Sequence, residues 1–164
     1  QGQRQFHTFV RLAEEEDVYQ ANNFMGISIA KSPNDFRNAD ILRLQRDSLT
    51  EVSFNYLDSA FTLYKQRDQW VADSFGADSA SVASYLQGLS YVTSREFAEV
   101  EAVGTPEVNV TFGFTDRAEI QISAYREGLD WVIGSTENGD EYFTDPTVFE
   151  KVFQGPSQLA VAVE

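Results

Sequence analysis

Few residues in this chain have both the type and the spacing that catalysis requires. His7 is the only histidine, so a Ser–His–Asp arrangement would have to use it as the general base. No Gly-x-Ser-x-Gly segment, the turn that presents a nucleophilic serine, accompanies it. The chain has no cysteine, which excludes thiol catalysis and thiolate metal sites within these residues. We therefore expect His7 to be an ordinary strand residue and assign no catalytic residue.

Two acidic runs are candidates for binding a cation. Residues 14–17 read Glu-Glu-Glu-Asp and residues 137–141 read Glu-Asn-Gly-Asp-Glu, so each run offers several oxygen ligands for calcium. Neither run has the spacing of a calcium loop, and with one histidine and no cysteine a zinc site lacks its ligands. We interpret both runs as solvated hairpin tips and expect no metal.

Two further kinds of active site have little support. The 26 acidic residues always permit some pair of carboxylates at the separation of about 5–10 Å that glycoside cleavage needs, so a hydrolase stays open as an alternative. The glycines Gly26, Gly76 and Gly88 are isolated and form no phosphate-binding loop. We therefore predict that the chain binds no nucleotide and carries no cofactor.

Aromatic side chains are the remaining candidates for a binding surface. They could form a flat platform for a sugar or a protein partner, but aromatic side chains also fill ordinary cores, which is the interpretation we favour. An exposed, contiguous patch would reverse that choice. Asn109-Val110-Thr111 matches an N-glycosylation acceptor, which we treat as a chance match in a strand. The candidates for the platform are Trp70, Trp131, Tyr64, Tyr85, Tyr91 and Tyr125.

Composition limits the partners. The chain has 164 residues, a formal net charge of −14 and an isoelectric point near 4.3. Such a surface repels nucleic acids and anionic lipids. A hydrophobic content of 42% is too high for a disordered acidic tail, so the charge lies on a folded body. Because no apolar run approaches the ~18 residues of a membrane span, we expect membrane contact only through a segment outside this chain.

The pattern of apolar residues predicts an α+β fold. We expect mainly antiparallel, meandering sheets with two to three helices packed on one face. One helix begins after Asp78 or Ser79 and carries the stripe Val82, Tyr85, Leu86 and Leu89. The other predicted helices are residues 24–31 and 146–153. The predicted strands lie within residues 6–12, 17–21, 52–56, 61–64, 70–72, 108–114, 120–125, 131–133 and 142–143.

The two ends of the chain resemble each other. The segment beginning Thr8-Phe9-Val10 aligns with the one beginning Asp130-Trp131-Val132, and Tyr19 aligns with Tyr142, about 123 positions later. This indicates an internal structural repeat. We predict that residues 1–38 are the tail of a preceding repeat, a hairpin plus a helix, and that residues 39–164 form one complete module. We expect the two to pack together as one compact unit.

The order of motifs between residues 35 and 100 resembles the family labelled domain of unknown function 4340, in its C-terminal portion. In that family a hairpin, a strand with a tryptophan and an Ala-Asp helix start recur, often in tandem. The motifs that carry the resemblance are Asp35-Phe36-Arg37, Ile41-Leu42-Arg43-Leu44, Gln69-Trp70-Val71, Ala77-Asp78, Tyr85-Leu86-Gln87-Gly88-Leu89 and Phe97.

The resemblance implies a bacterial, extracytoplasmic envelope protein tethered by a membrane segment and encoded near ABC-type transporters, including those linked to gliding. The family supplies no catalytic or binding residue to transfer. We therefore predict a non-catalytic scaffold or interaction module with a protein partner in the envelope. The alternatives are a glycan- or peptide-binding module, using exposed aromatics or a free sheet edge, and a hydrolase with an acidic pair.

Overall fold

The computed structural model describes residues 7–21, 31–99 and 104–161. The chain divides into two compact units, Gln1–Arg37 and Asn38–Glu164. In the first unit, β1 (Thr8–Val10) pairs antiparallel with β2 (Tyr19–Ala21), which confirms the predicted hairpin. A 3-10 turn, η1 (Pro33–Asp35), follows. The helix predicted over residues 24–31 falls almost entirely outside the described residues.

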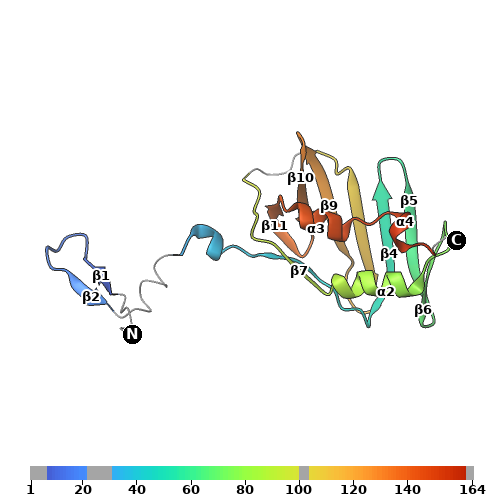
Figure 1. The fold of residues 1–164 in the computed structure, drawn as a ribbon, viewed down its shortest axis with the longest axis horizontal. Coiled ribbons are helices and arrows are strands. Elements are labelled where there is room, and N and C mark those ends of the chain that lie inside the picture. Colours follow the sequence, from blue (N-terminus) through green and yellow to red (C-terminus); the bar gives the residue numbers. More distant parts are fainter. Residues whose placement is uncertain (1–6, 22–30, 100–103, 162–164) are drawn as a thin grey trace, which may run out of the picture. The chain divides into compact units, whose positions relative to one another are not determined.

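The second unit is built on a seven-stranded antiparallel sheet (Figure 1). One meander runs through β4, β5 and β6, and a second runs through β8, β9, β10 and β11. The two meanders join where β4 pairs with β8, so the strand order is β11-β10-β9-β8-β4-β5-β6. The strands are β4 (Leu49–Tyr56), β5 (Ala60–Gln66), β6 (Gln69–Ala72), β8 (Val108–Phe114), β9 (Ile120–Glu127), β10 (Asp130–Ser135) and β11 (Asn138–Phe143).

A short ribbon and three short helices complete this unit. Strand β3 (Asp40–Arg43) pairs with β7 (Tyr91–Thr93). Helix α2 (Ser79–Gly88) begins after Asp78, whose side chain accepts a hydrogen bond from the backbone N–H of Ala80, as an N-cap does. Helix α3 (Pro146–Val152) is capped in the same way by Asp145, and α4 (Pro156–Leu159) is a single turn.

The core forms because apolar residues alternate along the strands. Val52 and Phe54 of β4 are fully buried, and the neighbouring strands β5, β8 and β9 bury every second residue in step with them. The buried residues of α2, α3 and α4 belong to the same cluster, which includes Val82, Leu86, Val148, Val152 and Leu159.

The fold class is confirmed at the level of α+β with a mainly antiparallel sheet. The internal repeat is not confirmed, because the two aligned hairpins differ in register. Tyr19 pairs with Val10, whereas Tyr142 pairs with Gly134 and not with Val132, the residue that the alignment places opposite it. That residues 1–38 and 39–164 pack as one unit stays a prediction.

Candidate ligand site on the open face of the sheet

The side chains that alternate with the core residues form a second, polar face of the sheet, which we call the open face. Neighbouring strands place similar residues side by side on it: Ser53 pairs with Thr62 on one side and with Thr111 on the other. The residues of this face are half-buried or exposed. They are Glu51, Ser53, Asn55, Thr62, Tyr64, Asn109, Thr111, Gln121, Ser123 and Tyr125.

Hydrogen bonds order the open face. The Oδ1 atom of Asn109 accepts a hydrogen bond of 2.7 Å from the Ser123 hydroxyl and one of 3.1 Å from the Gln121 amide. The Ser53 and Thr62 hydroxyls lie 3.2 Å apart and also form a hydrogen bond. Gln121 and Ser123 act as donors in the bonds to Asn109. The side-chain oxygen of each residue still has lone pairs that can accept hydrogen bonds.

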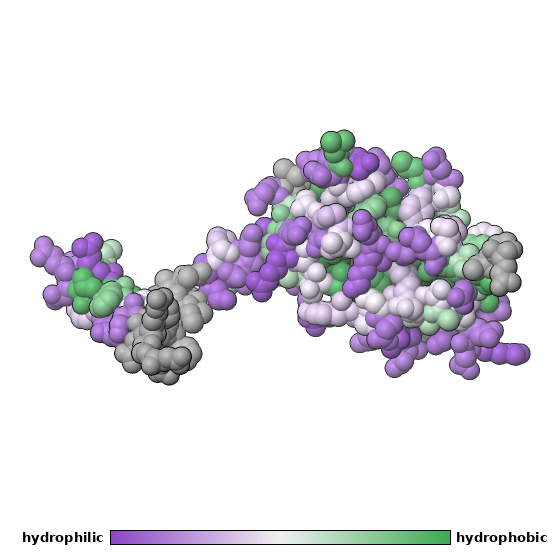
Figure 2. Space-filling view, viewed as in Figure 1, coloured by the Kyte–Doolittle hydropathy of each residue, from purple (hydrophilic) through white to green (hydrophobic). Residues whose placement is uncertain are grey.

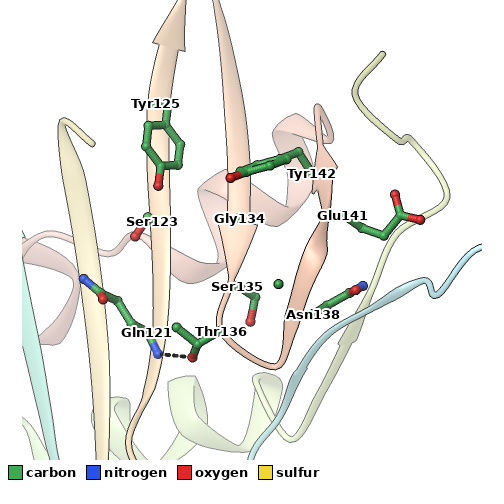
Figure 3. Close-up of a pocket in the computed structure, with 10 residues that line it drawn as sticks. Gln121, Ser123, Tyr125, Gly134, Ser135, Thr136, Asn138, Glu141 and Tyr142 are labelled. Atoms are coloured by element: carbon green, nitrogen blue, oxygen red, sulfur yellow. Dashed lines mark hydrogen bonds between the residues drawn. The ribbon is translucent and has the colours of Figure 1, made fainter. Parts of the chain in front are cut away.

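A hollow of about 210 Å³ lies on the open face over β9, β10 and β11 (Figure 3). Two tyrosines form its aromatic wall: the Tyr125 and Tyr142 ring centroids lie 6.1 Å apart, with the ring planes nearly perpendicular at 78°. Edge-to-face pairs of this kind are favourable because of the ring quadrupoles. We call this feature the hollow; its lining residues are Gln121, Ser123, Tyr125, Gly134, Ser135, Thr136, Asn138, Gly139, Glu141 and Tyr142.

Gly134 allows the tyrosine wall to form. Figure 3 shows the Tyr142 ring extending across β10 above Gly134. A Cβ atom at position 134 would lie 2.9 Å from Cε1 of Tyr142, closer than real Cβ contacts. A residue with a side chain would therefore push the ring away. The pairing of β10 with β11 also shifts register between Gly134 and Ser135, a local irregularity of the bulge type.

The turn below the hollow is anchored inside the protein. Asn138 is buried, and its Nδ2 donates hydrogen bonds of 2.8 and 2.9 Å to the carbonyl oxygens of Asn38 and Asp40. Glu137 forms a 2.6 Å ion pair with Arg117 and accepts a 2.6 Å hydrogen bond from the backbone N–H of Arg43. The expectation of a solvated tip at residues 137–141 is therefore wrong for Glu137 and Asn138, because both hold β3 to the sheet.

A family model described as a domain of unknown function (DUF4340) matches residues 1–116. The chain belongs to the DUF4340 family. No curated protein matches the chain, and no solved structure does either. The placement in a C-terminal portion is not borne out by this match. The residues of the hollow, between positions 121 and 142, lie beyond the matched range, so the case for a ligand there depends on geometry.

The six aromatic residues that could have formed a binding platform do not lie together in the structure. Trp70 is 8% exposed and belongs to the core, and Tyr85 and Trp131 pack against that core, as expected for aromatic residues in strands and helices. Tyr91, on β7, is 56% exposed and donates a hydrogen bond to Asp40. Only Tyr125 lines the hollow.

Tyr142 forms half of the aromatic wall of the hollow, although it was not among the aromatic residues predicted as a platform. The available signal was Gly134, an isolated glycine directly after the predicted strand 131–133, because a glycine at a strand often marks a close approach of another group to the backbone. The spacing of the sequence does not show which aromatic ring makes that approach.

The other candidate residues lie away from the hollow or serve the fold. His7 is exposed and its Nδ1 lies 2.5 Å from Nε2 of Gln20, a hydrogen-bonding distance. Glu15, in the first acidic run, accepts a 3.1 Å hydrogen bond from Tyr19. Across residues 7–21, 31–99 and 104–161, three or more His, Cys, Asp or Glu side chains nowhere cluster as a metal site would require. No helix within these ranges is long and apolar enough to span a membrane.

Two carboxyl groups of the described part of the chain, those of Asp78 and Asp145, have lowered pKa values, and both are helix caps. The Ser81 hydroxyl and the Ala80 backbone N–H lower the pKa of Asp78. Burial raises the pKa of Asp145, but hydrogen bonds from Thr147 and Ser94 outweigh that effect, so its pKa is lowered. A general acid needs a raised pKa, so neither group is suited to that role.

Proposed function

We propose that this DUF4340 chain is a non-catalytic interaction module of a membrane-tethered, envelope-facing bacterial protein that assists an ABC-type transport or gliding-related complex. The envelope setting is supported by the family resemblance alone, which is an argument by association. We also propose that α2, α3 and α4 cover one face of the sheet and that the module is part of a repeat. The shared core of the sheet and the helices supports the first of these two points.

The observation that carries the interaction role is the hollow on the open face. Its walls combine two tyrosine rings with hydroxyl and amide groups. Glu141 is the one carboxylate among the described residues that line it, whereas glycoside hydrolysis needs a facing pair. Apolar rings with a few placed polar groups are typical of a site that binds without reacting.

The chemistry of the hollow favours a neutral saccharide as its ligand. A sugar presents an apolar C–H face, which packs against aromatic rings, and many hydroxyl donors. The hollow supplies the matching acceptors through Gln121 and Ser123. The net charge of −14 disfavours an anionic ligand, so a neutral sugar is the better match.

Addition of a peptide strand to a sheet edge has less support, because both edges are partly covered. Next to β11, Ala98 N–H donates to the Tyr142 carbonyl, and Thr144 N–H donates to the Glu96 carbonyl, each at 2.8 Å. At β6, Trp70 N–H donates to the Ser79 hydroxyl at 3.1 Å. Strand addition requires unpaired backbone groups.

Titration with neutral disaccharides tests the saccharide proposal. Glucose-, galactose- and N-acetylglucosamine-based disaccharides would be added to the full chain, and binding would be followed by NMR shifts and calorimetry. We expect at least one to bind and Tyr142→Ala to weaken it by about tenfold or more, as removal of an aromatic anchor does. Gly134→Ala should also weaken it, because the new Cβ displaces the Tyr142 ring.

Tyr64→Ala is the matched control, since Tyr64 lies on the open face but does not line the hollow. Equal loss of binding in Tyr64→Ala and Tyr142→Ala would show that the hollow is not the site. Absence of binding by every disaccharide at millimolar concentration would remove the saccharide role. Fractionation of the producing cells, with protease treatment of intact cells, tests the envelope setting: protection of the module inside the cytoplasm would contradict it.

A further inference from the structure

A second surface feature lies at one end of the sheet, away from the open face. The β4–β5 turn, the start of β8 and the β9–β10 turn lie at this end because successive antiparallel strands reverse direction. A cavity of about 410 Å³ opens here, and we call it the end groove. Its lining residues are Tyr56, Leu57, Asp58, Ser59, Glu107, Val108, Trp131, Gly155 and Pro156.

This end of the protein exposes apolar side chains where hairpin tips are usually polar. Leu57, in the β4–β5 turn, is 73% exposed and lines the groove. Leu129, in the β9–β10 turn, is 93% exposed. Figure 2 shows apolar surface at this end of the second unit. An exposed apolar residue beside a groove, with a second one at the same end of the sheet, is a feature that interaction sites share.

Contacts within the protein hold the walls of the groove. The Trp131 ring stacks on Phe149 of α3, with ring centroids 4.6 Å apart, and the Arg126 guanidinium lies 4.3 Å from the centre of the same ring. The Tyr56 hydroxyl donates a 2.7 Å hydrogen bond to the carbonyl oxygen of Gln154. Because these side chains are already held in place, ordering them when a partner binds costs little free energy.

The second apolar tip is also held firmly. The β9–β10 connection consists of two residues, Gly128 and Leu129, between the paired residues Glu127 and Asp130. Gly128 has a φ of +61°, the left-handed conformation that such tight turns need. Arg126 donates a 3.2 Å hydrogen bond to the Leu129 carbonyl. Leu129 is therefore presented on a short, constrained loop.

The charged residues around the groove favour a partner of positive charge. Asp58 and Glu107 line the groove, and Glu127 and Asp130 flank Leu129. Arg126 is the opposing charge, and its guanidinium is stacked on Trp131. An apolar site with an acidic rim attracts cationic partners and repels anionic ones. A second copy of this chain, with its own net charge of −14, is therefore a poor occupant.

We propose that the end groove, together with the exposed Leu57 and Leu129, docks a basic–apolar segment of a partner protein, with an apolar side chain in the groove and lysine or arginine on the acidic rim. The proposal adds a second surface to the interaction role and does not depend on the hollow. It assigns the saccharide and the protein partner to different parts of the module.

The test uses the full chain and short synthetic peptides in which leucine alternates with lysine, with glutamate replacing lysine in the comparison peptide. We expect the lysine peptide to bind and the glutamate peptide not to bind. Leu57→Ser should weaken binding by about tenfold or more, as loss of an apolar anchor does. Asp58→Asn combined with Glu107→Gln should weaken binding and reduce its salt dependence.

Leu12→Ser is the matched control, because Leu12 is a 62% exposed leucine in the first unit, outside the groove. Equal loss in Leu12→Ser and Leu57→Ser, or equal binding by a peptide in which serine replaces leucine, would overturn the proposal by showing non-specific attraction. Binding of anionic vesicles through Leu57, or a dimer that Leu57→Ser dissociates, would also overturn it. Saccharide titration of Leu57→Ser separates the two sites: it should bind sugar as the parent does, whether or not the peptide result holds.

Discussion

Single polar side chains connect elements that are far apart in the sequence. Asn138 joins the β10–β11 turn to β3, while the Tyr56 and Tyr85 hydroxyls each donate 2.7 Å hydrogen bonds to carbonyl oxygens near the end of α3, those of Gln154 and Val152. A buried carbonyl that loses its donor costs more free energy than the hydrogen bond contributes when present. These few side chains therefore have a large effect on stability.

Asn138→Ala should lower the free energy of unfolding by about 1–3 kcal/mol, because it leaves two carbonyl oxygens without their donor. Urea unfolding followed by circular dichroism measures the change. Asn55→Ala, at an exposed position of the open face, is the control and should change stability by less than about 0.5 kcal/mol. Equal effects of the two substitutions would show that Asn138 does not act as an anchor.

Stability at alkaline pH should depend on Tyr56. Burial raises the pKa of Tyr56 to about 12, and burial also raises that of Tyr85 well above its ordinary value. The folded state therefore favours the neutral phenols, a stabilisation that is complete below the unfolded pKa of about 10. It is lost as the pH rises from there through the folded pKa. Tyr56→Phe should show a shallower decline of stability over this range in urea unfolding at stepped pH; an unchanged slope would contradict it.

At the scale of elements, the sequence predicted the helices that have a capping residue and an apolar stripe of their own. Helix α2 combines the Asp78 cap with an apolar stripe, and α3 combines Asp145 with Pro146, so both were predicted within one residue of their ends. Strand β7 and helix α4 were missed because three and four residues are too few to show a period. The hollow was missed because it depends on the register of β10 against β11, and the sequence placed a hairpin tip at residues 137–141, where β11 already begins at Asn138.

The Asp145 cap of α3 can be tested on its own helix. Asp145→Ala should lower the free energy of unfolding by about 1 kcal/mol, since its carboxylate accepts hydrogen bonds from the Thr147 and Val148 backbone N–H groups. Because the pKa of Asp145 is lowered, this stabilisation is present above about pH 4 and is lost as the pH falls through the folded pKa. The free energy of unfolding should therefore fall less steeply with decreasing pH in Asp145→Ala than in the parent protein, which urea unfolding at stepped acidic pH measures.

Glu150→Ala is the control for this helix, because Glu150 is exposed on α3 and is not a cap. Its effect on stability should stay below about 0.5 kcal/mol at neutral pH. If Glu150→Ala destabilised the protein as much as Asp145→Ala does, the loss of stability would come from removing a negative charge from the helix and not from removing the cap.

At the scale of the whole molecule, the polar and apolar surfaces are divided between the faces and ends of one sheet. Alternation along each strand buries one set of side chains and leaves the open face polar, while the apolar tips lie at the ends of hairpins. The fold class followed from this alternation in the sequence. The two binding surfaces did not, because each combines residues from strands that are distant along the chain.

The location of the core makes a last prediction about the two units. Every buried hydrophobic side chain of the described residues lies between Ile41 and Leu159, within the second unit. A fragment of residues 38–164 should therefore fold alone and melt cooperatively, because it keeps the whole of this core. The sequence also predicts that residues 1–38 pack against the module, which requires the full chain to melt at a higher temperature than the fragment. Calorimetry of both proteins decides: a fragment without a cooperative transition would contradict the first prediction, and equal melting midpoints would contradict the second.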